Sequence, residues 1–240
     1  MIKEAKQFGN GAQVLVPKEW IGRKVVLSLE RKTIDDIKVE VLSKIKDLSK
    51  IASIVLIGSY ARMEQEEGSD VDVVIFSTQR FEIKINNYHI IFINVNKLEE
   101  EISVNPALFK SILDEGVVIL NESFLENINI KQLYIKYYKK ECLNAYFLNK
   151  GFIELDKKQG TISESVIYSV ILRLRSLFIL KNKYSFKEFK KWLIRNKIKE
   201  FDKLYEIYKL IRDNKVVNEI DIKLINEIEK ANNMLAKESR

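Results

Sequence analysis

The chain has 240 residues, a formal net charge of +7 and a hydrophobic content of 46%, values typical of a globular protein with a sizeable core. No apolar run approaches the roughly 20 residues of a membrane-spanning helix, and the N-terminal segment lacks the apolar core of a signal peptide. A single cysteine, Cys142, excludes an internal disulfide and a cysteine-cluster metal site. We therefore expect a cytoplasmic protein with no membrane contact, and the basic balance favours partners that carry phosphate.

Residues 5–30 predict a small β-hairpin unit. Gly9-Asn10-Gly11 is a turn signal. A second turn is expected from Pro17 to Gly22, with one strand before it at Gln13–Val16 and one strand after it at Lys24–Leu29. The run from Phe8 to Lys18 resembles half of the swapped-hairpin module of AbrB/SpoVT-like proteins. That resemblance implies a homodimer and DNA binding. A hairpin that extends or caps the sheet of the next domain is the alternative, because so short a unit is marginal alone.

A helix and two strands are predicted next. Thr33-x-x-Asp36 is a capping signal, and the helix after it carries an apolar stripe from Ile34 to Leu48. The runs Ile54–Ile57 and Val73–Phe76 are short and rich in β-branched residues, so both predict buried strands.

The polar segment between these strands carries the chemistry. Side chains alternate along a strand, so Asp70 and Asp72 are expected on one face, where two close carboxylates favour a cation between them. Mg²⁺ prefers oxygen ligands and takes one or two carboxylates together with substrate phosphates. Gly58 permits a tight exit from the first strand, Ser59 offers a hydroxyl and an N–H to a phosphate, and Arg62 offers a cation.

Gly58-Ser59, a ten-residue spacer and Asp70-Val71-Asp72 resemble the signature of minimal nucleotidyltransferases of the DNA polymerase β superfamily. The resemblance implies transfer of an NMP from an NTP to an acceptor (a protein, an RNA or a small molecule) with release of pyrophosphate. It also implies that Asp70 and Asp72 are catalytic and hold Mg²⁺ or Mn²⁺, and that Gly58, Ser59 and Arg62 bind the nucleotide.

The following segment completes the predicted sheet but departs from the family. A hairpin is expected from Phe81–Ile85 and Tyr88–Val95. A helix that is broken near Pro106 follows it, and then a last strand at Val117–Leu120. The helices are expected to cover one face of the sheet. The superfamily normally adds a third carboxylate from a neighbouring strand, and Tyr88–Val95 contains none. Ile91 is the position that we align with that acid. The only histidine, His89, is expected in the core or on a sheet edge.

From Ile130 onward apolar stripes at helical spacing predict a helical bundle. Its placement is similar to that of the helical domain of kanamycin-type nucleotidyltransferases and of HEPN domains, although no histidine follows Arg173 or Arg175 as a HEPN ribonuclease requires. Either arginine could meet a phosphate or an internal acid. The lysine-rich run at residues 181–199 indicates a solvated helix face or, less often, a phosphate-binding one.

These features predict an α+β protein with three units. They are a hairpin module at residues 1–31, a nucleotidyltransferase domain with a small mixed sheet at 32–127, and a helical bundle at 128–240. The alternative function is a catalytically weak regulator or antitoxin-like protein that binds DNA or a partner protein, such as a HEPN-type protein.

Overall fold

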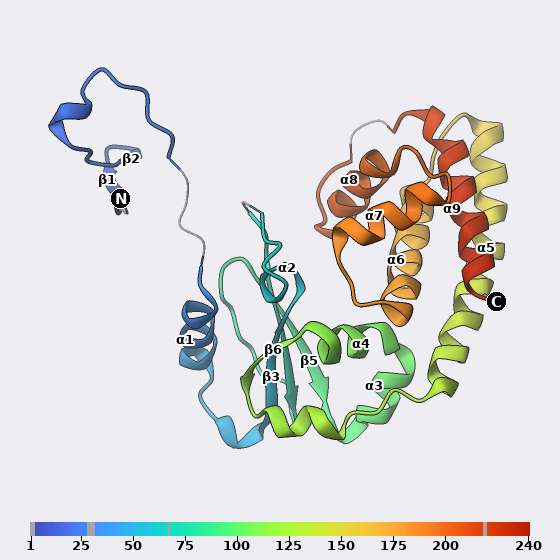
Figure 1. The fold of residues 1–240 in the computed structure, drawn as a ribbon, viewed down its shortest axis with the longest axis horizontal. Coiled ribbons are helices and arrows are strands. Elements are labelled where there is room, and N and C mark those ends of the chain that lie inside the picture. The colour runs from blue at the N-terminus through green and yellow to red at the C-terminus, as the bar shows by residue number, and fades with distance from the viewer. Residues whose placement is uncertain (1–2, 28–31, 67, 218–219) are drawn as a thin grey trace.

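A four-stranded mixed sheet lies at the centre of the first large unit (Figure 1). The computed structural model describes residues 3–27, 32–66, 68–217 and 220–240. The strand order is β5-β4-β3-β6, with bounds β3 Ile51–Ile57, β4 Val71–Ser77, β5 Tyr88–Asn94 and β6 Val117–Leu120. β3 is antiparallel to β4 and β6, whereas β4 and β5 are parallel. The predicted α+β class and mixed sheet are confirmed.

Helices cover both faces of this sheet, so the expectation of helices on one face was wrong. α3 (Leu98–Val104) and α4 (Pro106–Glu115) pack on the face that carries Val55, Val74 and Phe76. α1 (Ile34–Lys44) packs on the opposite face, against Ile54, Leu56 and Ile75. Both sets of alternating side chains on β3 and β4 are mainly apolar, and each set needs a cover to leave water.

Local signals define the helix boundaries in this unit. Thr33 accepts a hydrogen bond from the backbone N–H of Asp36, and the Asp36 carboxylate accepts one from the N–H of Thr33, which completes a capping box. The predicted break near Pro106 separates α3 from α4, where Asn105 caps the second helix and proline occupies its first turn.

The expected hairpin of Phe81–Ile85 with Tyr88–Val95 does not form. Residues 81–85 are not a strand, and β5 pairs in parallel with β4, so the chain crosses the sheet between them. Phe81, Ile83 and Ile85 pack on the α1 side of the sheet. Their alternating apolar pattern therefore reflects packing on a face of the sheet and not strand pairing.

The N-terminal unit also differs from the expected hairpin. The strands are β1 (Lys6–Phe8) and β2 (Gly11–Gln13), which pair directly across the turn at Gly9 and Asn10. The strands predicted at Gln13–Val16 and Lys24–Leu29 were wrong as far as the structure describes them, to residue 27. The positive φ of Gly9 (56°) permits a tight turn, which pairs the residues that flank it directly.

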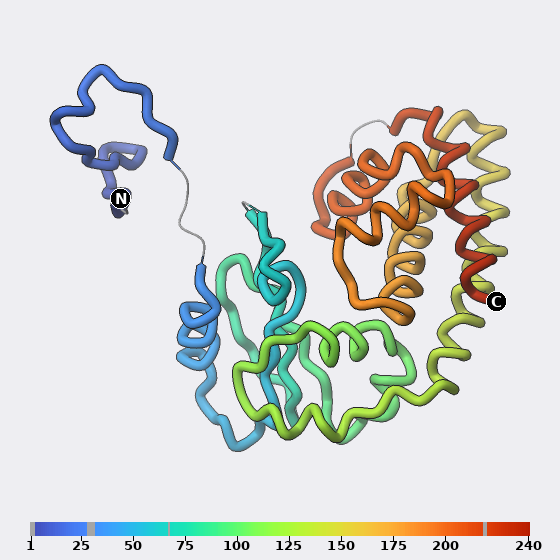
Figure 2. The backbone as a smooth tube through the Cα atoms, in the orientation of Figure 1, coloured from blue at the N-terminus to red at the C-terminus, as the bar shows by residue number. Residues whose placement is uncertain are grey.

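In the described part of the chain, the C-terminal bundle contains five α-helices, as predicted (Figures 1 and 2). They are α5 Gln132–Gln159, α6 Glu164–Lys181, α7 Phe186–Arg195, α8 Phe201–Arg212 and α9 Ile225–Glu238. α6 contributes the largest share of buried side chains and contacts α4, α5, α8 and α9. Because α4 belongs to the sheet unit, the bundle packs directly against that unit. No helix in the described ranges is long and apolar enough to cross a membrane.

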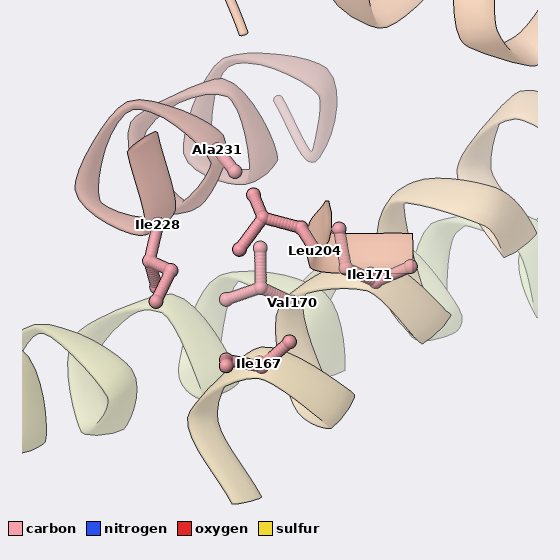
Figure 3. Close-up of a pocket in the computed structure, with 6 residues that line it drawn as sticks. All are labelled: Ile167, Val170, Ile171, Leu204, Ile228 and Ala231. Atoms are coloured by element: carbon pink, nitrogen blue, oxygen red, sulfur yellow. The ribbon is translucent and has the colours of Figure 1, made fainter. Parts of the chain in front are cut away.

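Two spaces in the structure lie away from the Gly-Ser turn and from Asp70 and Asp72. Figure 3 shows a gap between α6, α8 and α9 that is lined by apolar side chains and has no room for a water molecule, so it is a packing feature of the bundle core. A polar cavity of about 210 Å³ lies beside Ser77 and Asn94, at the opposite ends of β4 and β5 from Asp72.

Candidate functional site

The turn that follows β3 brings its backbone against Asp72. Gly58 begins the short helix α2 (Gly58–Ala61) and has a φ of 76°, a backbone conformation that residues with a β-carbon rarely adopt. A β-carbon built on Gly58 would lie 2.3 Å from Oδ2 of Asp72. Ile57 pairs with Asp72 across the two strands. The sheet register therefore places the carboxylate at the start of the Gly-Ser turn.

The two aspartates lie at the start of β4. Asp72 is the second residue of the strand and its side chain is one-third exposed, whereas Asp70 precedes the strand and is exposed. Both charges act on the same imidazole, that of His89. Asp70, Asp72, Gly58 and Ser59 are thus brought to one end of the sheet.

His89 lies beside Asp72, a relationship that sequence patterns alone did not show. It is on the edge strand β5 and pairs with Asp72 in the parallel register, with Nδ1 at 3.1 Å from Asp72 Oδ1. The hydrogen bond with Asp72 raises the pKa of His89, an effect that burial and the charge of Arg212 oppose. With 66% of its side chain exposed, His89 is an edge residue at the site and not a core residue.

The guanidinium of Arg62 is held by two acids. Nε lies 2.8 Å from Glu64 Oε2, and Nη1 lies 3.2 Å from Oε1 of Glu115, a side chain that is only 2% exposed. The hydroxyl of Ser111 also donates to Glu115. Arg62 therefore ties the end of the Gly-Ser turn to α4, and these ion pairs keep its donors away from solvent.

An aromatic ring of the bundle completes this cluster. Tyr184, in the connection between α6 and α7, lies 4.8 Å from the guanidinium carbon of Arg62 and 4.8 Å from that of Arg175 on α6. Cations at this distance from a ring are attracted by its negative faces. One tyrosine thereby links the Gly-Ser turn to the helical bundle.

The donors present suit a hard divalent cation. Asp70 and Asp72 supply carboxylate oxygens, and Mg²⁺ commonly uses one or two of these with the phosphates of its substrate. No cluster of three or more histidine, cysteine, aspartate or glutamate side chains that could hold a metal occurs within the described ranges. Glu99 on α3 accepts hydrogen bonds from Lys131 and Tyr134, so its carboxylate is bound to these two side chains and not to the pair of aspartates.

Other residues singled out in the sequence lie outside the site. Cys142 is buried in the bundle core, where burial raises the pKa of its thiol to about 11. Arg173 donates to Ser169 on its own helix. In the lysine-rich run, Lys181, Lys190 and Lys191 form ion pairs with Glu238, Asp202 and Glu188.

Comparisons with known proteins show which family this chain is similar to. The sequence model of the nucleotidyltransferase domain family matches residues 38–168, more than half of the chain. A second model, described as a "putative transposon-encoded protein", matches residues 1–29.

Three curated relatives each match a little over one-third of this chain. Two proteins of Methanocaldococcus jannaschii, each named "putative protein adenylyltransferase", are 35% identical to this chain over 98 residues, which is 37% of this chain and 99% of either relative. A third protein of that name from the same organism is 33% identical over 106 residues.

A solved nucleotidyltransferase-like protein from Exiguobacterium sibiricum aligns with 84% of this chain and 74% of its own, at 11% identity and a TM-score of 0.33. That score is too low to establish a shared fold. The family match and the nearly complete coverage of the Methanocaldococcus relatives do not depend on it. On those two findings, this chain belongs to the nucleotidyltransferase domain family.

Proposed function

We propose that the protein transfers an NMP from an NTP to an acceptor and releases pyrophosphate. The observation that carries this proposal is the apposition of Asp72 to the Gly-Ser turn, with Asp70 two residues before it. In the reaction an acceptor oxygen or nitrogen forms a bond to the α-phosphorus, and the bond from that phosphorus to the bridging oxygen of pyrophosphate breaks. The acceptor's proton leaves to a base or to solvent.

Each residue of the site has a proposed role. Asp70 and Asp72 would hold Mg²⁺ or Mn²⁺, which when bound offsets phosphate charge and favours departure of pyrophosphate. Gly58 leaves room for close approach, and Ser59 donates from its hydroxyl and N–H to the β- and γ-phosphates. Arg62 would contact a phosphate only after leaving Glu64 and Glu115, so its proposed contact with nucleotide requires those ion pairs to open.

The absence of an acid on β5 predicts slow transfer. His89 occupies the position beside Asp72, and Ile91 lies next to Val74. General base catalysis is typically worth about 10²–10⁴-fold, so an acceptor that arrives ionised, or Mn²⁺ in place of Mg²⁺, should accelerate the reaction. A protein acceptor and ATP are our first choices, because the relatives are named as candidate protein adenylyltransferases; RNA and small molecules remain candidates.

A second candidate function is that of a catalytically weak regulator or antitoxin-like protein. The N-terminal unit favours it, because its apolar side chains are widely exposed, among them Ile21 (78%) and Val26 (96%). We propose that this unit, residues 1–31, acts as an AbrB-like module that forms a homodimer and binds DNA. The nucleotidyltransferase domain would then span residues 32–127, and a kanamycin-nucleotidyltransferase-like or HEPN-like bundle residues 128–240. A HEPN-type protein is a candidate partner, and the cytoplasm is the expected location.

A transfer assay separates these two functions. Purified protein is incubated with each α-³²P-labelled NTP, Mg²⁺ or Mn²⁺, and acceptors that include cell RNA and cell protein. Label transferred by the wild-type protein, and lost in Asp72→Asn, supports the enzyme. No transfer with any nucleotide and acceptor, together with retarded migration of DNA, supports the regulator.

A further inference from the structure

Arg175 is a half-buried cation of the helical bundle. It lies on α6, and its Nε is buried without a hydrogen-bond partner, although the residue as a whole keeps partial exposure. No carboxylate in the described part of the chain forms an ion pair with it. Burial lowers the pKa of Arg175 while Tyr184, Tyr208 and Tyr205 raise it, so the net pKa is raised and the guanidinium stays charged. Burying an unpaired charge is costly, which indicates a missing anion.

The surroundings place this cation next to the nucleotide-binding turn. Arg175 and Arg62 contact the same Tyr184 ring, each with its guanidinium carbon 4.8 Å from the ring centre. Arg62 is only three residues beyond Ser59. Arg62 has two acids to balance its charge, whereas the groups that raise the pKa of Arg175 are the phenols of three tyrosines. An anion at the Gly-Ser turn would therefore lie near a cation to which the described residues offer no carboxylate partner.

A second arginine of the bundle, Arg212, carries a charge that acts on His89. Arg212, at the end of α8, has an exposed side chain, and its Nε lies 2.7 Å from Oδ1 of the neighbouring Asp213. Tyr208, which stacks at 5.4 Å on Tyr168 and also neighbours Tyr205, lies near both Arg175 and Arg212. The two arginines thus share Tyr208 as a neighbour.

We propose that Arg175, with Arg212, binds the β- and γ-phosphates of the NTP and so supplies the second wall of the nucleotide site from the helical bundle. This inference rests on the proposed transfer function, because it assigns the same nucleotide. A planar guanidinium donates paired hydrogen bonds to phosphate oxygens, which suits the end of a triphosphate and the departing pyrophosphate. Tyr184 acts as a positioning residue that keeps Arg175 against the turn.

Binding measurements on full-length protein test the proposal. Wild type, Arg175→Gln and Arg212→Gln are titrated calorimetrically with Mg²⁺-ATP, inorganic tripolyphosphate and AMP. We expect Arg175→Gln to weaken ATP and tripolyphosphate binding about tenfold or more and to leave AMP binding within about twofold. Arg173→Gln is the matched control, because Arg173 lies on the same helix but bonds Ser169, and it should bind all three ligands as wild type does.

Arg212→Gln keeps the test decisive if Arg175→Gln does not fold, because the Arg212 side chain is exposed. We expect Arg212→Gln to weaken the binding of ATP and of tripolyphosphate at least threefold. Unchanged polyphosphate affinity in both variants, in a protein that transfers nucleotide, overturns the inference and leaves the transfer function intact. Arginine-dependent tripolyphosphate binding in a protein that transfers no nucleotide retains the anion site and overturns the transfer function. Equal weakening of AMP and ATP by Arg175→Gln would mean a general structural role and would also overturn the inference.

Discussion

Gly58 and Asp72 approach so closely that a β-carbon on residue 58 would lie 2.3 Å from Asp72 Oδ2. Gly58→Ala should therefore displace the carboxylate or the turn. The φ of 76° adds strain of about 1–2 kcal/mol to any such variant. We expect Mg²⁺-ATP affinity to fall at least tenfold, because both parts of the site move, and calorimetry measures this.

Gly151→Ala is the matched control for that variant. Gly151 lies inside α5, is exposed, and a β-carbon there would meet nothing within 4 Å. Alanine should stabilise the helix by up to about 1 kcal/mol and leave nucleotide binding unchanged. Equal ATP affinity in both glycine variants would contradict the proposed geometry.

The register of β5 predicts how a third carboxylate could be supplied. His89 pairs with Asp72, so His89→Asp should place an acid beside the existing pair, whereas Ile91, the position that the sequence aligns with the family's acid, pairs with Val74. We expect His89→Asp to transfer nucleotide about tenfold faster than wild type, because the new acid should supply part of the rate gain that a general base typically gives. The measurement is the initial rate of label transfer with Mg²⁺.

Ile91→Asp serves as the comparison, because Ile91 lies on the same strand face but packs toward the core that contains Phe76. An acid there should destabilise the protein without accelerating transfer. Faster transfer by Ile91→Asp than by His89→Asp would mean that the assigned register of β5 is incorrect.

Glu115 should stabilise the protein through Arg62. Glu115→Gln keeps the shape of the side chain and removes its charge, leaving Arg62 with Glu64 alone. We expect the free energy of unfolding to fall by about 1–3 kcal/mol, since Glu115 is only 2% exposed. Urea denaturation at pH 7 measures it. Glu64→Gln changes a more exposed acid and should lower the free energy of unfolding by less than about 1 kcal/mol. A larger loss in Glu64→Gln than in Glu115→Gln would refute the stabilising role of Glu115.

The N-terminal unit should drive self-association. Its short hairpin cannot bury much surface alone, and Val26 is 96% exposed. Deleting residues 1–30 should convert a dimer into a monomer in light scattering. Val26→Asp should weaken the dimer, while Val39→Asp, at an exposed position of α1, should not. A full-length protein that is already monomeric rules this out.

Local patterns predicted much of the fold. The β-branched runs before Gly58 and after Asp70 predicted β3 and β4, and Thr33 and Pro106 predicted helix boundaries, because capping and proline act within one turn. The helices of the bundle followed from their apolar periodicity.

Features that depend on distant pairing could not be predicted. The parallel pairing of β5 is set by a crossover, so the neighbour of Asp72 is His89, 17 residues away. Arg62 meets Glu115 across 53 residues, and the contact of Arg175 with Tyr184 needs the turn after α6. No local periodicity encodes such contacts.

The most direct test of the account is calorimetric binding of a non-hydrolysable ATP analogue with Mg²⁺. Asp70→Asn and Asp72→Asn should each weaken this binding at least tenfold, because each removes a carboxylate proposed to hold the cation. Asp35→Asn, at a carboxylate whose side chain is 91% exposed on α1, should bind as wild type does. Wild-type affinity in both site variants would contradict the assignment of Asp70 and Asp72 as the metal-nucleotide site.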